Sequence, residues 1–174
     1  TLRAFGARDG IAAFNAALSA GSPFSVVVTD FTMDDADGLG LDREWTWISK
    51  DAGWLVYDHR GSGRITSALQ LFGNVTFWMF WANGYEAMRA LDDNQDGRLE
   101  GQELTGLAIW QDANRNGVSD PGEVASLDRW GITALSCDYR SEDESDVFVA
   151  YSPGGVTFAD GTRHATYDLL LHPR

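Results

Sequence analysis

Oxygen-bearing side chains recur at a fixed spacing in residues 92–123. The pattern occurs twice, from Asp92 to Glu103 and from Asp112 to Glu123. Each copy has Asp or Asn at positions 1, 3 and 5, Gly at position 6 and Glu at position 12. A calcium ion takes about six to eight oxygen ligands in a flexible shell, and glycine allows the surrounding chain to turn sharply because it adopts positive φ without steric cost. Each copy is therefore predicted to bind one calcium ion.

This is the ligand spacing of an EF-hand calcium loop, in which position 7 contributes its backbone carbonyl, position 9 acts directly or through water, and the last glutamate contributes both oxygens. The predicted ligands are Asp92, Asn94, Asp96, Arg98, Glu100 and Glu103 in the first loop, and Asp112, Asn114, Asn116, Val118, Asp120 and Glu123 in the second loop. The first loop is expected to bind more tightly because more of its ligands are charged. Calcium is favoured over magnesium, which requires a tight octahedron.

The elements next to the loops must hold them in place. The two loops start too close together in sequence for two complete helix–loop–helix units. Residues 101–111 are therefore expected to form one short helix that serves both loops, with Leu104, Leu107 and Trp110 on its buried face. Residues 84–91 are expected to form the helix that leads into the first loop.

Residues 33–44 repeat the pattern incompletely. Asp35, Asp37 and Glu44 occupy positions 3, 5 and 12, but position 1 is a methionine, which is a poor calcium ligand. Two interpretations stay open: a weak third calcium site, or an acidic turn that leads into a strand.

Residues 58–69 form a fourth, more divergent copy. Asp58 and Gly63 fit positions 1 and 6, whereas Arg60 and Leu69 occupy positions 3 and 12, where oxygen ligands belong. These substitutions argue against a metal ion, and we expect Arg60 to supply the positive charge instead.

Composition limits the classes of partner. The chain has 174 residues, 44% of them hydrophobic, a net charge of −13 and a pI of about 4.4. Such a surface repels phosphate backbones and anionic lipids, so neither nucleic acid binding nor membrane insertion is expected. The only cysteine, Cys137, excludes an internal disulfide and a cysteine-ligated zinc site. We expect the chain to be a mature form or an excised piece of a longer protein, because it starts without methionine.

The expected fold class is α+β, with paired short EF-hand-like calcium loops and short helices packed on an antiparallel β-sheet. A helix is predicted over 9–20, a strand over 23–31, a short helix over 124–130, a strand over 132–139 and a hairpin turning at Asp160–Gly161. One domain over 1–174 is expected. It consists of an N-terminal helix and strand (1–32), a calcium-binding core (33–139) and a C-terminal β-hairpin (140–174).

Aromatic residues are concentrated just before the first loop. Phe77, Trp78, Phe80 and Trp81 are expected in the core, because buried aromatic side chains dominate core energetics. The alternatives are a platform on which sugars or bases stack, and an exposed aromatic surface at 75–85 that binds another protein.

The order of the motifs over 33–139 resembles the calcium-binding segments of bacterial RTX-type exoproteins. It is similar in particular to their self-processing modules, calcium-dependent domains that cut an Asp–Pro bond. The motifs that carry the resemblance are WIS-x-D-x-G-W-L-V-x-D, LFG, GYEAMRALDDNQDG, IWQDANRNGVSDPGE and WGI. The resemblance implies a secreted or surface location, and it implies that the ligands named above bind calcium.

The expected function is that of a calcium-binding domain of a secreted or surface bacterial protein, in which calcium stabilises or switches the fold. No catalysis is expected. The alternatives are a calcium-dependent self-processing module and a protein-interaction adaptor, whose partner would be another protein or another part of a longer parent chain. Self-cleavage within this chain is disfavoured, because its Asp–Pro bond, Asp120–Pro121, lies inside the second loop.

Overall fold

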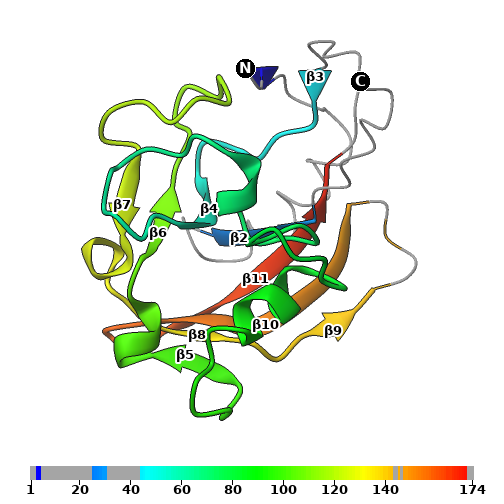
Figure 1. The fold of residues 1–174 in the computed structure, drawn as a ribbon, viewed down its shortest axis with the longest axis vertical. Helices are drawn as coiled ribbons and strands as arrows, with labels where there is room; N and C mark the ends of the chain where they lie inside the picture. The colour runs from blue at the N-terminus through cyan, green and yellow to red at the C-terminus, as the bar shows by residue number, and fades with distance from the viewer. Residues whose placement is uncertain (1–2, 5–24, 31–43, 143–144, 146, 172–174) are drawn as a thin grey trace.

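The computed structural model describes residues 3–4, 25–30, 44–142, 145 and 147–171 (Figure 1). Its strands are β1 Arg3–Ala4, β2 Ser25–Asp30, β3 Glu44–Trp45, β4 Ala52–Tyr57, β5 Arg98–Glu100, β6 Leu107–Trp110, β7 Val124–Ser126, β8 Ile132–Ser136, β9 Arg140–Ser141, β10 Phe148–Phe158 and β11 Arg163–Leu170. Nine of them form one sheet in the order β5–β8–β10–β11–β2–β4–β6–β7, with β9 paired to β10 outside this path. Strands β1 and β3 make a separate parallel pair.

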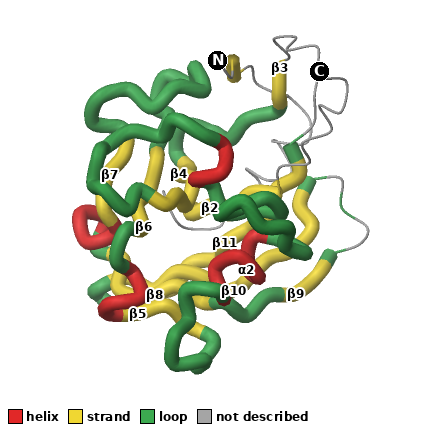
Figure 2. The backbone as a smooth tube through the Cα atoms, in the orientation of Figure 1, coloured by secondary structure: helices red, strands yellow, loops and turns green. Residues whose placement is uncertain are grey.

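Helices are few in the described residues, and loops make up much of the chain between strands (Figure 2). The described residues contain one α-helix, α2 Gly84–Arg89, and three 3-10 turns, η1 Ala68–Gln70, η2 Gly101–Leu104 and η3 Leu127–Trp130. Asn83 caps α2 by accepting a hydrogen bond from the Glu86 backbone N–H. The helix predicted before the first loop is thus confirmed over 84–89.

The predicted fold class, α+β with paired calcium loops and helices packed on an antiparallel sheet, is wrong. The described chain is mostly a mixed β-sheet, and β2 at its centre pairs parallel with both β11 and β4. The two loops do not form a pair. The first loop runs into β5 and the second ends immediately before β7, and these strands lie at opposite ends of the strand order.

Residues 101–111 show why the shared helix was mispredicted. The chain makes the short turn η2, passes through Gly106 at φ +83° and continues as β6, whose four residues are all buried. A continuous apolar run that is buried on both faces fits a strand as well as a short helix, and the three-residue spacing of leucines could not distinguish them. The short helix predicted over 124–130 is likewise strand β7 followed by η3.

The strand predictions fared better. The strand expected over 23–31 is β2, the one over 132–139 is β8, and the predicted Asp160–Gly161 turn joins β10 to β11. The helix predicted over 9–20 lies outside the described residues. No helix in the described part of the chain is long and apolar enough to cross a membrane.

Both faces of the sheet carry a hydrophobic core. Alternate residues of β4 belong to different clusters: Leu55 packs in one with Ile109 of β6, whereas Trp54 packs in the other with Trp110. Because side chains alternate across a strand, this pattern places apolar groups on both sides of the sheet. Strands β4 and β6 are therefore covered by apolar side chains on both faces.

We predict that Gly155→Ala destabilises the fold. A Cβ at Gly155 in β10 would overlap Oγ1 of the buried Thr166 and lie 2.7 Å from its Cβ. Such overpacking costs roughly 1–3 kcal/mol, measured as the free energy of unfolding in urea. The control is Gly154→Ala, where the nearest atom is Arg163 Cδ at 3.5 Å. Equal losses of unfolding free energy in the two variants would contradict the predicted clash with Thr166.

Candidate functional site

The first loop (92–103) folds around the Asp92 carboxylate. Oδ2 of Asp92 accepts from the Gly97 N–H at 2.8 Å and Oδ1 accepts from the Asp96 N–H at 3.2 Å. Gln95 and Gly97 have φ of 60° and 81°, so the chain turns twice through the left-handed region. Oδ1 of Asn94 also accepts from the Asp96 N–H at 2.8 Å. The side chains at positions 1 and 3 thus face into the loop.

Glu103 closes the first loop. Its Oε1 accepts from the N–H groups of Asp93 and Asn94, at 3.0 and 3.3 Å, and its Oε2 accepts from the Glu100 N–H at 3.1 Å. The position-12 carboxylate therefore points back over the loop backbone, as a closing ligand must.

The second loop (112–123) repeats these contacts. Asp112 accepts from the Gly117 N–H at 2.8 Å and from the Asn116 N–H at 3.1 Å. Glu123 accepts from the N–H groups of Ala113 and Asp120, both at 3.0 Å. The positive φ values also recur at positions 4 and 6, in Arg115 and Gly117. Two separate segments thus adopt one loop structure.

The side-chain atoms that face into these loops are hard oxygens, which are the ligands that calcium prefers. Among the described residues, no three Asp, Glu, His or Cys side chains gather closely enough to hold an ion as they stand. Many of the carboxylate oxygens in both loops accept hydrogen bonds from backbone N–H groups, and so do the amide oxygens of Asn94, Asn114 and Asn116. The donor chemistry fits the ion. Its coordination would require these side chains to move closer together.

The 58–69 loop keeps the same start without the closing glutamate. Asp58 accepts from the N–H groups of Ser62 and Gly63, at 2.9 and 2.7 Å, and from the Ser62 hydroxyl at 2.8 Å. Arg60 does not take the place of an ion in the described contacts. It is exposed, and its Nε donates to His59 Nε2. The possible third site at Asp35, Asp37 and Glu44 cannot be placed, since 31–43 lie outside the described residues.

The second loop contacts the 58–69 loop. Ser119 Oγ accepts from the Ile65 N–H at 2.8 Å and donates to the Ile65 carbonyl at 3.2 Å. Both residues stand at position 8 of their loops. A second distant contact comes from Trp47, whose Nε1–H donates to Asp112. Loop spacing gave no signal for either contact.

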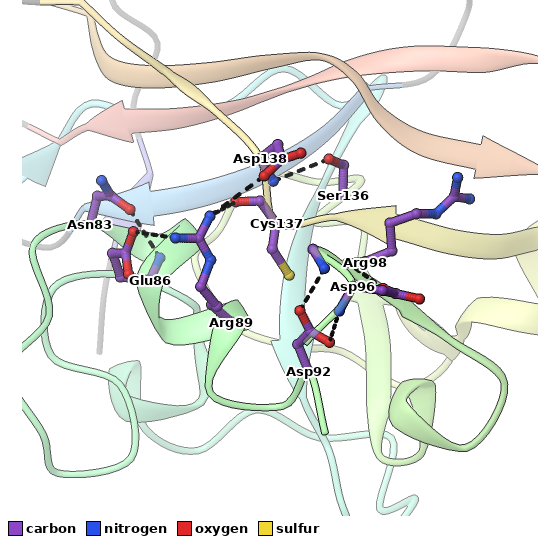
Figure 3. Close-up of polar contacts among 10 residues, drawn as sticks. Asn83, Glu86, Arg89, Asp92, Asp96, Arg98, Ser136, Cys137 and Asp138 are labelled. Atoms are coloured by element: carbon purple, nitrogen blue, oxygen red, sulfur yellow. Dashed lines mark hydrogen bonds and ion pairs between the residues drawn. The ribbon is translucent and has the colours of Figure 1, made fainter. Parts of the chain in front are cut away.

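Arg89 connects α2 to the strand end beside the first loop (Figure 3). Its guanidinium donates to the Glu86 carboxylate and to the Cys137 carbonyl, and lies 3.7 Å from Asp138. The Cys137 N–H in turn donates to the Gly97 carbonyl at 2.8 Å. These groups border an open cavity of about 580 Å³, which is lined by Arg89, Asp92, Gln95, Asp96, Gly97 and Asp138.

The aromatic residues before the first loop divide between core and surface. Phe77 and Trp81 pack against the core, but Trp78 and Phe80 are 85% and 90% exposed. The core prediction is therefore wrong for these two. Phe77 and Trp78 have positive φ, and the buried Thr76 holds the turn by accepting from the Gly73 N–H. This placement favours the alternative of an aromatic interaction surface.

We predict that the Cys137 thiol reacts slowly in the folded protein. Burial raises its pKa to about 12, and the neighbouring Asp92 carboxylate acts in the same direction. The thiol therefore stays neutral from pH 7 to 9, and the reactive thiolate is scarce. The rate of labelling with a chromogenic disulfide should be low at neutral pH and should still be rising with pH at pH 9. The rate should become high when the chain is unfolded in urea. A plateau in the native rate near the ordinary thiol pKa of about 8.5 would contradict this.

Comparison with known proteins places the chain in a family. A model of the SPM domain matches residues 24–172. The chain is also 32% identical over 144 residues to the iron-regulated protein FrpA of Neisseria meningitidis serogroup C. That alignment covers 79% of this chain and 13% of FrpA, so the chain spans only a small part of the relative's length. Because the family model covers most of the chain, both loops included, the chain belongs to the SPM domain family.

Proposed function

We propose that the chain is a calcium-binding domain whose fold is stabilised or switched by ions in the first and second loops. The observation that carries this proposal is the repetition of one loop structure in two segments. In each, the carboxylates at positions 1 and 12 and the side chain at position 3 accept hydrogen bonds from the loop's own backbone. A chance acidic turn would not reproduce all of these contacts twice.

Electrostatics supports the same proposal. The first loop brings Asp92, Asp96 and Glu103 into one turn, in a chain that already carries a net charge of −13. A divalent cation would relieve this repulsion and would bind the native state in preference to the unfolded chain. Such binding stabilises a fold by roughly 2.7 kcal/mol at a hundredfold excess over Kd. Calcium sites of extracellular modules have Kd values of about 10⁻⁴–10⁻³ M, and we propose a secreted or surface location on the basis of the motif resemblance.

Calorimetric titration of the metal-free chain with calcium is expected to show two sites, the tighter one in the first loop. Glu103→Gln should abolish the tighter site, because it removes the charge that closes the loop, and should leave the second site intact. The matched control is Asp93→Asn, which removes one charge from the same loop at an exposed position that is not a predicted ligand. No heat from calcium binding in the unmodified chain would refute the proposal, as would equal effects of the two variants.

A second candidate function is calcium-dependent cleavage of an Asp–Pro bond. It rests on the order of motifs that this chain shares with self-processing modules. The bond Asp120–Pro121 is a poor substrate, since Asp120 holds the second loop together. Its carboxylate accepts from the side-chain amides of Asn114 and Asn116, and its N–H donates to Glu123. We therefore propose that any cleaved bond lies outside this chain.

The cleavage candidate predicts a calcium-dependent product from a longer natural polypeptide. The chain with its native upstream sequence should yield one new fragment when calcium is added, with its cut at an Asp–Pro bond located by mass spectrometry. The same polypeptide with Glu103→Gln and Glu123→Gln should remain intact. An intact wild-type polypeptide in millimolar calcium would remove this candidate and leave calcium binding untouched.

A further inference from the structure

Trp47 supplies the second loop with a contact that the first loop lacks in the described structure. The indole Nε1–H of Trp47 donates to Oδ2 of Asp112 at 2.7 Å, across a separation of 65 residues. Both side chains are buried, with exposed fractions of 2% and 1%. The same oxygen accepts from the Gly117 N–H at 2.8 Å, so two donors converge on it.

The position-1 carboxylates of the other loops have local donors. Those of Asp92 are the N–H groups of Asp96 and Gly97, and those of Asp58 come from Ser62 and Gly63. Each of these donors lies within five residues of its acceptor. In the second loop the position-1 carboxylate keeps the two local donors and gains a third donor from a distant segment of the chain.

The indole itself is firmly held. Its ring packs edge-on against Trp54 and Trp110, with ring centroids 5.2 and 5.6 Å apart. These two tryptophans are register partners on β4 and β6, so they belong to the sheet. A rigid indole restricts the rotation of the Asp112 carboxylate, and because it is neutral it adds no positive charge to compete with a cation.

We infer that Trp47 is a positioning residue that raises the calcium affinity of the second loop. The inference rests on the calcium-binding function proposed above. Groups that orient a metal ligand typically contribute about 10- to 100-fold in metal affinity. Coupling of this kind is reciprocal, so calcium in the second loop also strengthens the docking of residues 46–49 on the sheet. The second loop thereby links ion binding to a segment far away in sequence.

Titrations in a Glu103→Gln background test the inference, because only the second loop then binds calcium. Adding Trp47→Phe should weaken calcium binding about 10- to 100-fold, since the ring is kept and the N–H donor is lost. The matched control is Trp81→Phe. It also keeps an aromatic ring and removes one indole hydrogen bond, from Nε1–H to the Thr76 carbonyl, but Trp81 packs against the other core cluster. This control should leave the affinity unchanged.

A second measurement leaves Trp47 unchanged, so it does not depend on whether the Trp47 variant folds. In the unmodified chain, calcium should slow amide hydrogen exchange at residues 46–49 as well as in the second loop. In the Glu123→Gln variant, the protection of 46–49 should be lost.

The outcomes separate the two proposals. Absence of calcium binding in the unmodified chain would refute the proposed function itself. If calcium binds but Trp47→Phe and Trp81→Phe have equal affinities, the role of Trp47 is refuted and calcium binding stands. The role of Trp47 is also refuted if Trp47→Phe, in the chain that retains Glu103, lowers the calcium affinity of both loops to the same extent. It is refuted as well if amide exchange at 46–49 does not respond to calcium.

Discussion

The loops of this domain depend on one interaction, in which an aspartate accepts hydrogen bonds from the backbone N–H groups four and five residues ahead. Asp58, Asp92 and Asp112 each make it, and the glycine N–H lies 2.7 or 2.8 Å from the carboxylate. The interaction ties the two ends of a tight turn together. The 58–69 loop shows that this turn persists when the closing glutamate is replaced by leucine. The loop shape is therefore set by Asp and Gly, whereas under the proposed function the remaining oxygens would bind the ion.

The sheet gives the loops their positions. Strand β5 forms part of the first loop, and β7 directly follows the second, so the loops stand at the two ends of the strand order. Between these ends, strands from the beginning, middle and end of the chain pair with one another. Under the proposed function, two ions would stabilise the edges of the sheet, where strands have fewer neighbours. Contacts from Ser119 to Ile65 and from Trp47 to Asp112 connect the second loop with other parts of the chain.

Local features were predictable from sequence and distant ones were not. The turns at Gly97 and Gly117 and the inward direction of Glu103 and Glu123 follow from spacing within twelve residues. The prediction of a shared helix over 101–111 failed because a short apolar run shows no period that distinguishes a helix from a strand. The strand order and the Trp47 contact depend on residues far apart in sequence. A single sequence carries no signal for such distant contacts. The role expected for Arg60 is not seen in the described contacts, where Arg60 donates to His59 and the Ser62 hydroxyl donates to Asp58.

The turn that exposes Trp78 has an optical consequence. Among the tryptophans Trp47, Trp54, Trp78 and Trp110, only Trp78 is exposed, whereas the other three form one buried cluster. Emission from the cluster is shielded from dissolved quenchers, while Trp78 is open to them. These four tryptophans therefore fall into two chromophore populations. The buried population reports on the interior beside the second loop, and Trp78 reports on molecules that approach the exposed aromatic turn.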